Sequence, residues 1–349
     1  MVKKAENILV GISIGDLNGI GSEVVLKTFE DTRMLELCTP VIFANVKMLS
    51  FLRKSFESAA TLHGIDKLDQ IVPGKINVFN LWKENFDLEN GVTNDVVGKY
   101  AIKSFMAATQ ALKEGIVDVL VTAPINKYNI QSEEFKFPGH TDYLNQELEG
   151  EALMLMVNDN LRVGLLTDHV PIAEISQHLT EKLIRQKIKT IKQTLIQDFK
   201  ISKPKIAVLG LNPHCGDQGV IGKEDDEVIR PTIKKLFDEG TFVFGPYAAD
   251  SFFGQKSHEK FDAVIACYHD QGLIPFKTLS FGHGVNYTAG LDRIRTSPDH
   301  GTAFDIAGKN QADNNSFKEA VYLALDIYRA RIEYAQITEK PLKIKEKQF

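Results

Sequence analysis

The sequence has few cysteines and no long apolar run. Its three cysteines, Cys38, Cys215 and Cys267, are an odd number without C-x-x-C spacing, which argues against a disulfide framework and fits a reducing compartment. No stretch reaches the 18 or more apolar residues that indicate a membrane span. No segment resembles a signal peptide. We therefore expect a cytoplasmic protein.

A strong charge of either sign is also missing. The 41 Lys and Arg residues nearly balance the 46 Asp and Glu residues, which leaves a net charge of -5. This balance gives no electrostatic reason to expect nucleic acid or an anionic membrane as a partner. The content of 43% hydrophobic and 25% charged residues is ordinary for a globular protein. A chain of 349 residues is long enough for two domains.

The chain does contain a regular alternation of apolar runs and helical patterns. Short runs rich in Val, Ile and Leu predict buried strands, and segments with apolar residues three or four positions apart predict helices. The predicted strands include 8–14, 40–46, 117–122 and a pair around Asn158-Asp159-Asn160, and the predicted helices are 23–29, 47–57, 97–114, 175–199, 224–238 and 317–335. This alternation, with one antiparallel hairpin, predicts an α/β protein with a mixed sheet.

Three histidines each follow an apolar run: His169, His214 and His269. Open α/β sheets bind ligands at the carboxyl ends of their strands, so three imidazoles at such ends suggest one shared site. A divalent metal with an open coordination position is the simplest chemistry that uses three neutral imidazoles. The alternative for each is an ordinary hydrogen-bonded structural histidine. The neighbouring Cys215 and Cys267 are interpreted as small buried hydrophobes rather than thiolate ligands.

Two glycine-containing loops are candidates for phosphate binding. The segment 15–23 follows a predicted strand and opens a predicted helix, but it lacks the third glycine of a G-x-G-x-x-G fingerprint. A tight turn capped by Ser22 is the alternative there. The segment 138–142 precedes a short predicted helix, whose free N–H groups favour an anion. His140 can donate to that anion, and an ordinary capping turn is the alternative.

A third candidate region contains Lys277, Asn286 and Arg295. These side chains can grip carboxylate or phosphate oxygens, and arginine does so through two parallel hydrogen bonds. Scattered surface charge is the alternative for the lysine. Arg295 is a stronger candidate because it directly precedes the polar loop 296–303.

Together these motifs resemble the 4-hydroxythreonine-4-phosphate dehydrogenase family. The matching segments, from about residue 8 to about residue 310, are 15–23, 121–127, 139–141, 168–169, 212–214, 268–272 and 295–308. The resemblance implies that one divalent metal per site (zinc, cobalt, manganese or magnesium) is held by His169, His214 and His269. It also implies a set of substrate contacts: His140, Thr141, Lys277, Asn286 and Arg295.

The segment 300–310 is similar to the adenosine-binding loop of the isocitrate and isopropylmalate dehydrogenases, which bind NAD without a Rossmann fingerprint. This similarity implies NAD or NADP as cofactor, bound by Gly301, Thr302, Ala303, Asp305 and Asn310. It also implies two α/β/α domains with mixed sheets and an active-site cleft between them. Residues 1–135 plus 285–349 would form the first domain, with both termini and the adenosine-type loop. Residues 136–284 would form an inserted domain with the metal ligands and the dimer interface.

The family pattern implies metal- and NAD(P)-dependent oxidation of 4-phosphohydroxy-L-threonine to the 3-keto acid. Decarboxylation to 3-amino-2-oxopropyl phosphate follows, in pyridoxal 5'-phosphate biosynthesis. Lys277 and Asp250 are the predicted catalytic residues: Lys277 moves a proton or neutralises the carboxylate, and Asp250, with Asp270, orients the histidines. The enzyme is expected to be a homodimer whose metal ligands come from both subunits.

Small departures from the family pattern leave the substrate open. Leu17 and Ser22 stand where prolines are usual in the first glycine loop, and Tyr247-Ala248 differ from the family pattern in the segment 245–250. A related dehydrogenase acting on D-threonate or D-erythronate 4-phosphate would use the same residues. A metal-dependent phosphoester hydrolase would also need histidines and a phosphate site, but it gives no reason for the loop 300–310. A non-catalytic sugar-phosphate sensor is the remaining alternative.

Overall fold

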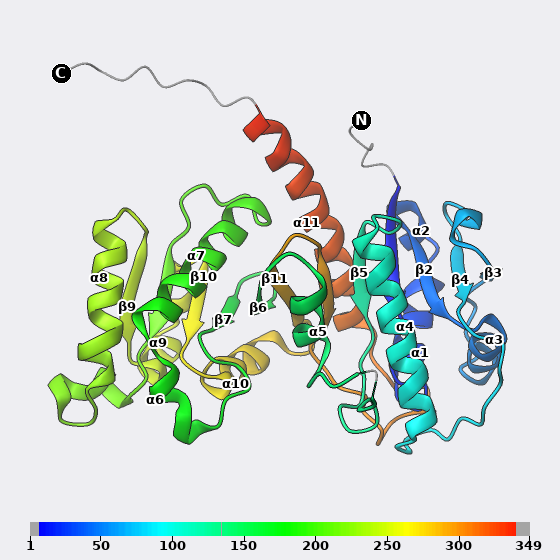
Figure 1. Ribbon diagram of the computed structural model, residues 1–349, viewed down its shortest axis with the longest axis horizontal. Coiled ribbons are helices and arrows are strands. Elements are labelled where there is room, and N and C mark those ends of the chain that lie inside the picture. The colour runs from blue at the N-terminus through cyan, green and yellow to red at the C-terminus, as the bar shows by residue number, and fades with distance from the viewer. Residues whose placement is uncertain (1–6, 134, 340–349) are drawn as a thin grey trace.

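The computed structural model of the chain describes residues 7–133 and 135–339 (Figure 1). Within these residues, twelve strands form one continuous sheet. In the order in which they pair, the strands are β3 (Leu62–Ile65), β4 (Ile76–Asn80), β2 (Cys38–Ala44), β1 (Ile8–Ser13), β5 (Val119–Thr122), β12 (Arg295–Pro298), β11 (Val285–Leu291), β6 (Gly150–Val157), β7 (Arg162–Leu165), β10 (Ala263–Ala266), β8 (Ile206–Leu209) and β9 (Val243–Tyr247).

The sheet has two parallel blocks joined by antiparallel strands. The strands from β3 to β12 pair in parallel, and so do those from β7 to β9. Between the blocks, β12 pairs with β11, β11 with β6 and β6 with β7, all antiparallel. The predicted α/β class is confirmed, and the predicted hairpin is the β6–β7 pair. The expected mixed sheets are joined into one, because the ladder between β11 and β6 connects the two blocks.

Three neighbouring strands carry the histidines singled out in the sequence. His169 follows β7, His269 follows β10 and His214 follows β8, and these strands are adjacent and parallel. Residues of β8 and β10 are buried throughout, as expected for parallel strands covered on both faces. The carboxyl ends of the three strands therefore share one edge of the sheet.

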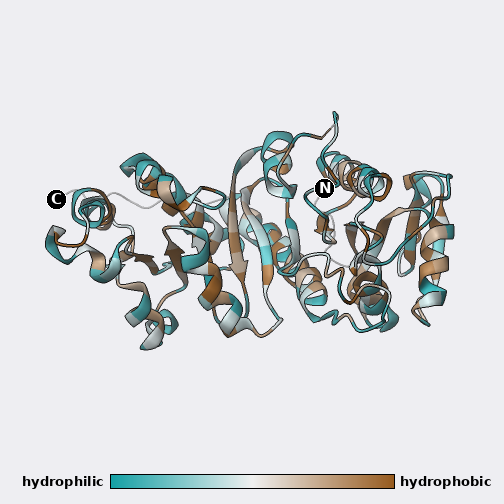
Figure 2. Cartoon of the chain, turned by 90° about the horizontal axis from the view of Figure 1, so that it is seen from below, coloured by the Kyte–Doolittle hydropathy of each residue, from teal (hydrophilic) through white to brown (hydrophobic). Residues whose placement is uncertain are grey.

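Helices cover both faces of the sheet. They are α1 (Gly21–Glu30), α2 (Met34–Leu37), α3 (Val46–Ser55), α4 (Asp95–Lys113), α5 (His140–Glu147), α6 (Ile175–His178), α7 (Glu181–Gln197), α8 (Arg230–Asp238), α9 (Ala249–Gly254), α10 (His269–Ser280) and α11 (Asn315–Glu339). A continuous apolar cluster packs α1, α3, α7, α8 and α11 against one face. The opposite face has two separate clusters, one under α4 and α5 and one under α9 and α10. Figure 2 shows the strands mostly in hydrophobic colours, whereas the helices carry both hydrophobic and hydrophilic colours.

Local capping decides where two helices begin. The predicted helix 175–199 is divided into α6 and α7, because the Thr180 hydroxyl accepts a hydrogen bond from the Leu183 amide and starts a new helix. The predicted cap at Ser22 is wrong. Ile20 is the residue before α1, and its side chain does not cap that helix. The Ser22 hydroxyl is buried and has no partner among the described residues.

The strand order is compatible with the predicted division into two domains, which stays a prediction. In the order of the sheet, the seven strands from β3 through β1 to β11 come from residues 1–135 and 285–349. The five remaining strands, β6, β7, β10, β8 and β9, come from residues 136–284. The first group lies on the right in Figure 1 and the second on the left. Residues 1–6 and 340–349 of the predicted first domain lie outside the described residues. None of the described helices is long and apolar enough to cross a membrane.

Candidate active site

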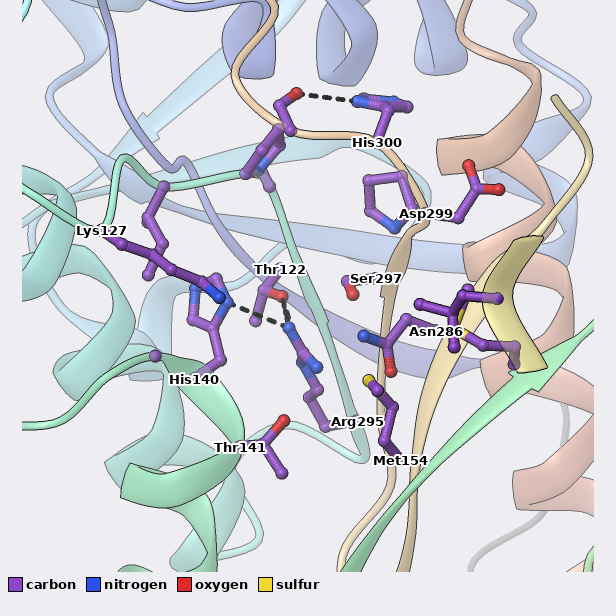
Figure 3. Close-up of a pocket in the computed structure, with 18 of the residues that line it drawn as sticks. Thr122, Lys127, His140, Thr141, Met154, Asn286, Arg295, Ser297, Asp299 and His300 are labelled. Atoms are coloured by element: carbon purple, nitrogen blue, oxygen red, sulfur yellow. Dashed lines mark hydrogen bonds between the residues drawn. The ribbon is translucent and has the colours of Figure 1, made fainter. Parts of the chain in front are cut away.

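A cavity of about 270 Å³ is lined by both α5 and α10, on the sheet face where these helices belong to separate apolar clusters. Its other walls come from the end of β5 with the loop that follows, from β6, β11 and β12, and from the loop after β12. The structure brings together in this cavity all the residues predicted to bind substrate: His140, Thr141, Lys277, Asn286 and Arg295. Figure 3 labels His140, Thr141, Asn286 and Arg295 of this set.

Arg295 is a buried cation without an acidic partner. It is 1% exposed, and its guanidinium donates to the hydroxyls of Thr122 and Thr288. No carboxylate among the described residues forms an ion pair with it. Burial lowers the pKa of Arg295, yet an arginine keeps its proton in a protein. Because a buried charge is costly without a counter-charge, this end of the cavity favours an anion.

His140 lies beside Arg295 at the start of α5. Its Nδ1 is 3.1 Å from Arg295 Nη2, and its ring packs edge-on against Phe105 with centroids 4.5 Å apart. Burial, and then the positive charges of Arg295 and Lys127, lower the pKa of His140 well below its usual value. The imidazole is therefore neutral at pH 7, and its buried Nε2 has no partner among the described residues.

Two further polar atoms at the cavity lack partners. Asn286 Oδ1 and His300 Nε2 are both buried without a hydrogen bond in the described protein. On the α10 side, Lys277 Nζ donates to the Asp299 carbonyl at 3.1 Å. Buried polar groups in native proteins are normally paired. Unpaired atoms around one cavity therefore indicate a polar ligand.

Two of the three predicted metal ligands, His169 and His269, line this cavity. Their ring centroids are 6.0 Å apart. His269 Nδ1 lies 2.7 Å from Asp270 Oδ1. A carboxylate at one ring nitrogen leaves the other free for a metal, so the pair fits part of a metal site. The contact also supports the predicted orienting role of Asp270.

His214 does not line the cavity. It lies in the turn Pro213–Gly219 after β8, in which residues 214–218 all have φ between 45° and 81°. This left-handed run is costly for L-residues. The chain just before the turn is fixed by the buried Asp225 carboxylate, which accepts hydrogen bonds from the amides of Leu211 and Asn212. Within the described residues of one chain, no three His, Cys, Asp or Glu side chains form a metal-binding group. The structure thus brings His169 and His269 together and leaves His214 apart from them.

Asp250, a predicted catalytic residue, also lies outside the cavity. It is in α9 and lines a separate surface hollow with Tyr268 and Asp270. Its carboxylate accepts a hydrogen bond from the Ser251 hydroxyl. Within one chain Asp250 therefore lies near Asp270, whose carboxylate contacts His269. It does not line the cavity that holds the predicted substrate residues.

The predicted cofactor loop continues from the rim of the cavity. Gly301 lines the cavity, and a Cβ at this position would meet no atom within 4 Å. The next carbonyl, of Thr302, accepts from the Ile20 amide. A Cβ on Gly19 would lie 2.8 Å from that same carbonyl oxygen. The glycine turn at 15–21 therefore supports the cofactor loop by close packing.

The remaining predicted cofactor residues lie beyond the cavity lining. Ala303 and Asn310 have φ of 43° and 56°, which bends the loop back on itself. The Asn310 amide donates to the Phe56 carbonyl, so that part of the side chain is engaged within the protein. The Asp305 backbone carbonyl accepts from the Lys309 ammonium. Of the five predicted cofactor residues, Gly301 alone lines the cavity.

Thr122, Lys127 and His300 are among the cavity-lining residues for which the sequence motifs predicted no site role. Thr122 and Lys127 stand in the 121–127 segment that supported the family resemblance. His300 directly precedes the predicted cofactor residues. Their places in these motifs were the available signal, and Figure 3 shows their side chains around the cavity.

Comparison with known proteins agrees with this picture. The model of the family described as pyridoxal phosphate biosynthetic protein PdxA matches residues 36–324. A 4-hydroxythreonine-4-phosphate dehydrogenase from Bacteroides thetaiotaomicron is 44% identical over 338 residues, which cover 96% of this chain and 93% of the relative. A protein from Oceanobacillus iheyensis, provisionally named D-threonate 4-phosphate dehydrogenase, is 35% identical over 91% of this chain and 97% of its own.

The fold is similar to that of a solved relative. The crystal structure of 4-hydroxythreonine-4-phosphate dehydrogenase from Klebsiella pneumoniae matches with a TM-score of 0.78 and 32% identity, over 93% of this chain and 98% of that one. The family predicted from the sequence motifs is confirmed. Sequence, fold and cavity lead to one conclusion: the chain belongs to the PdxA family of pyridoxal phosphate biosynthetic proteins.

Proposed function

We propose that this chain is an NAD(P)-dependent 4-hydroxythreonine-4-phosphate dehydrogenase. It oxidises 4-phosphohydroxy-L-threonine to the 3-keto acid, which loses carbon dioxide to give 3-amino-2-oxopropyl phosphate for pyridoxal 5'-phosphate synthesis. The observation that carries this proposal is the buried, uncompensated Arg295 beside a neutral His140 with a free Nε2. In a member of the PdxA family, such a pair is suited to the substrate's phosphate.

The phosphate end of the site would position the rest of the substrate. Arg295 supplies charge, and His140 Nε2 and the Thr141 hydroxyl supply hydrogen bonds to phosphate oxygens. Binding energy from this remote group holds the reacting carbon in place, which lowers the barrier to oxidation. Lys277, across the cavity, neutralises the carboxylate or takes part in proton transfer.

The metal end is assigned to His169 and His269, with His214 supplied from the second subunit of a homodimer. This assignment agrees with the absence of His214 from the cavity lining within the described residues of one chain. Asp270 at His269 Nδ1 fixes the ring and leaves Nε2 available. A bound divalent metal would supply Lewis-acid activation of the substrate hydroxyl, and imidazole ligands suit zinc, cobalt or manganese better than magnesium.

The cofactor is assigned to the loop 300–310. The unpaired His300 Nε2 and the open surface at Gly301 fit a polar ligand next to the substrate cavity. NAD or NADP, when bound, supplies the hydride acceptor. The residues of the loop position that acceptor against the substrate carbon.

Oxidation of D-threonate 4-phosphate is the second candidate, because a relative of 35% identity carries that provisional name. D-erythronate 4-phosphate would be handled by the same residues. Phosphoester hydrolysis would use the metal and phosphate ends but would leave the loop 300–310 without a role.

A spectrophotometric comparison tests the proposal. The purified enzyme, stripped with a chelator and reloaded with zinc, cobalt, manganese or magnesium, is given each of the three phosphates with NAD and with NADP. We expect metal-dependent absorbance of the reduced cofactor, fastest with 4-phosphohydroxy-L-threonine. His269→Ala, with its fold checked by circular dichroism, is the inactive control. Faster turnover of threonate 4-phosphate would favour the second candidate, and phosphate release without cofactor reduction would favour hydrolysis.

A further inference from the structure

The side chain that holds Arg295 is Thr122, the last residue of β5. Thr122 Oγ1 accepts hydrogen bonds from Arg295 Nε at 3.1 Å and from Nη2 at 2.5 Å. Thr122 and Arg295 are both buried, and Thr122 lines the cavity. Two bonds to one oxygen fix the direction in which the guanidinium plane points.

The same Nη2 atom also reaches His140. It lies 3.1 Å from His140 Nδ1, as the dashed lines in Figure 3 show. A guanidinium has donors and no acceptor, so Nδ1 must be the acceptor in this bond. A neutral imidazole has one protonated nitrogen, so the proton lies on Nε2. The Phe105 ring packs edge-on against this imidazole, which limits how far the His140 ring can turn.

We propose that Thr122 is a positioning residue: it sets the Arg295 guanidinium so that Nη2 holds His140 as the Nε2–H tautomer. The anion end of the cavity then presents a fixed cation and a neutral N–H donor. The identity of that anion as the substrate's phosphate rests on the proposed function. The chain from Thr122 through Arg295 to His140 does not, because it exists within the protein alone.

Thr288 gives a matched control. Its hydroxyl accepts from the other terminal nitrogen, Arg295 Nη1, at 3.1 Å. Thr288 is equally buried, and within the described residues its hydroxyl bonds to Arg295 and not to His140. Removing this hydroxyl deletes one bond to the same guanidinium while leaving the Nη2 branch intact.

The first test reads the tautomer directly in the ligand-free protein. Nitrogen-15 NMR of histidine-labelled protein at pH 8 identifies the protonated ring nitrogen, and His140→Gln identifies which signals belong to His140. We expect a protonated Nε2 and an unprotonated Nδ1 in the wild type, Thr122→Ser and Thr288→Val. In Thr122→Val we expect a mixture of both tautomers.

A protonated Nδ1 in the wild type would overturn the proposal. So would a His140 signal in Thr122→Val that is the same as in the wild type. Thr122→Ala deletes the same hydroxyl without adding a methyl group, and it replaces the valine variant if that protein does not fold. Neither readout needs a substrate, so failure here is distinguishable from absence of dehydrogenase activity in the wild type.

The second test measures the consequence for anion binding with inorganic phosphate as the probe. Calorimetry should give a Kd raised about fivefold or more in Thr122→Val, because a charge-assisted hydrogen bond to the anion is lost or misdirected. Thr122→Ser should restore the wild-type value. In turnover, KM should rise more than kcat falls. Equal losses in Thr122→Val and Thr288→Val would show a general packing effect and would contradict a positioning role for Thr122.

Discussion

At the scale of single residues, Arg295 combines a stability cost with a binding role. Replacing a buried ion pair by apolar side chains is often neutral or stabilising, and Arg295 has no acidic partner among the described residues that its removal would leave uncompensated. We therefore expect Arg295→Met to weaken phosphate binding by about 10- to 100-fold without lowering the midpoint of urea unfolding. Calorimetry with phosphate and urea titration check the two parts.

Arg293→Met is the control for this prediction. Arg293 is two residues beyond the end of β11 and donates to the Lys113 carbonyl, away from the cavity. It should leave phosphate binding unchanged. A strongly destabilised Arg295→Met that still binds phosphate would show that Arg295 is a structural residue.

His140 predicts a pH dependence of stability. Its pKa is lowered in the folded protein, chiefly by burial and then by Arg295 and Lys127. Below pH of about 6.5 the unfolded chain binds a proton at this histidine while the folded chain does not, so the free energy of unfolding falls as pH falls. The slope from this one group is at most about 1.4 kcal/mol per pH unit.

His140→Gln should flatten the loss of stability between pH 6.5 and the folded pKa. Urea unfolding of both proteins at several pH values measures the difference. His178→Gln, at an exposed position on α6, makes the same chemical change away from the cavity. If the wild type and His140→Gln lose stability in parallel as pH falls, the buried imidazole has no such role.

Sequence motifs could predict which residues form the site, but they could not predict the hydrogen bonds between those side chains. The substrate set from His140 to Arg295 was predicted through the family resemblance, and the structure brings its members to one cavity. Thr122 was part of a matching motif, but a threonine at the end of a buried strand has no pattern that marks it as a hydrogen-bond acceptor for a buried arginine. Such a role depends on which strands pair, here β5 with β12.

At the scale of elements, the left-handed turn after β8 predicts a difference between two glycines. A Cβ on Gly216 would lie 2.4 Å from the Gly222 carbonyl oxygen, whereas a Cβ on Gly219 would come no closer than 3.8 Å to Lys223. Both have positive φ, so alanine at either position costs about 1 kcal/mol in backbone strain. Gly216→Ala must in addition displace the turn that carries His214.

We expect Gly216→Ala to weaken metal binding by about tenfold or more, as changes around metal ligands do. Gly219→Ala should lower stability with little effect on the metal. Competition with a coloured chelator measures the affinity for zinc, and urea unfolding measures the stability. Unchanged zinc affinity in Gly216→Ala would remove the turn from the metal site.

Helix α11 is attached to the end of helix α7 by a buried ion pair. Arg331 Nε donates to Asp198 Oδ1 at 2.7 Å, and the Tyr287 hydroxyl donates to the same carboxylate. Asp198 is 5% exposed. Arg331→Met leaves that carboxylate buried without its cation and should cost about 3–5 kcal/mol. Tyr287→Phe should cost about 1 kcal/mol, and chemical unfolding compares the two. If Arg331→Met lowers the free energy of unfolding as little as Tyr287→Phe does, water has replaced the arginine beside Asp198.

Long periodic elements were predictable at this scale, and short ones were not. The helix at 97–114 and the strand at 8–14 correspond to α4 and β1. The short strands β3 and β12 were not identified, since their sequences, Leu-His-Gly-Ile and Arg-Thr-Ser-Pro, are not the apolar runs that predict buried strands. The order of the strands across the sheet was also beyond the sequence, because pairing between distant segments leaves no local pattern.

At the scale of the whole molecule, the position of His214 predicts a site made from two subunits. His214→Ala and Arg295→Ala are each expected to be inactive. If each site combines Arg295 of one subunit with His214 of the other, a mixed dimer contains one complete site. Random reassociation of equal amounts should then restore about one quarter of wild-type activity.

Mixing after brief denaturation and refolding, followed by the cofactor-reduction assay, tests this prediction. Each variant refolded alone is the control. No recovery in mixtures whose hybrid content is verified by mass spectrometry would place the complete site within one chain.

The two ends of the sheet limit how copies of this protein can associate. Strand β3 at one end has four residues, and β9 at the other carries Pro246, which has no N–H to donate. Short or proline-containing edges discourage the addition of a further strand. Within the described part of the chain, we therefore expect the proposed homodimer to form through helices and loops. The same edges protect the protein from aggregation at high concentration, since neither offers a long backbone template on which another copy could build a fibre.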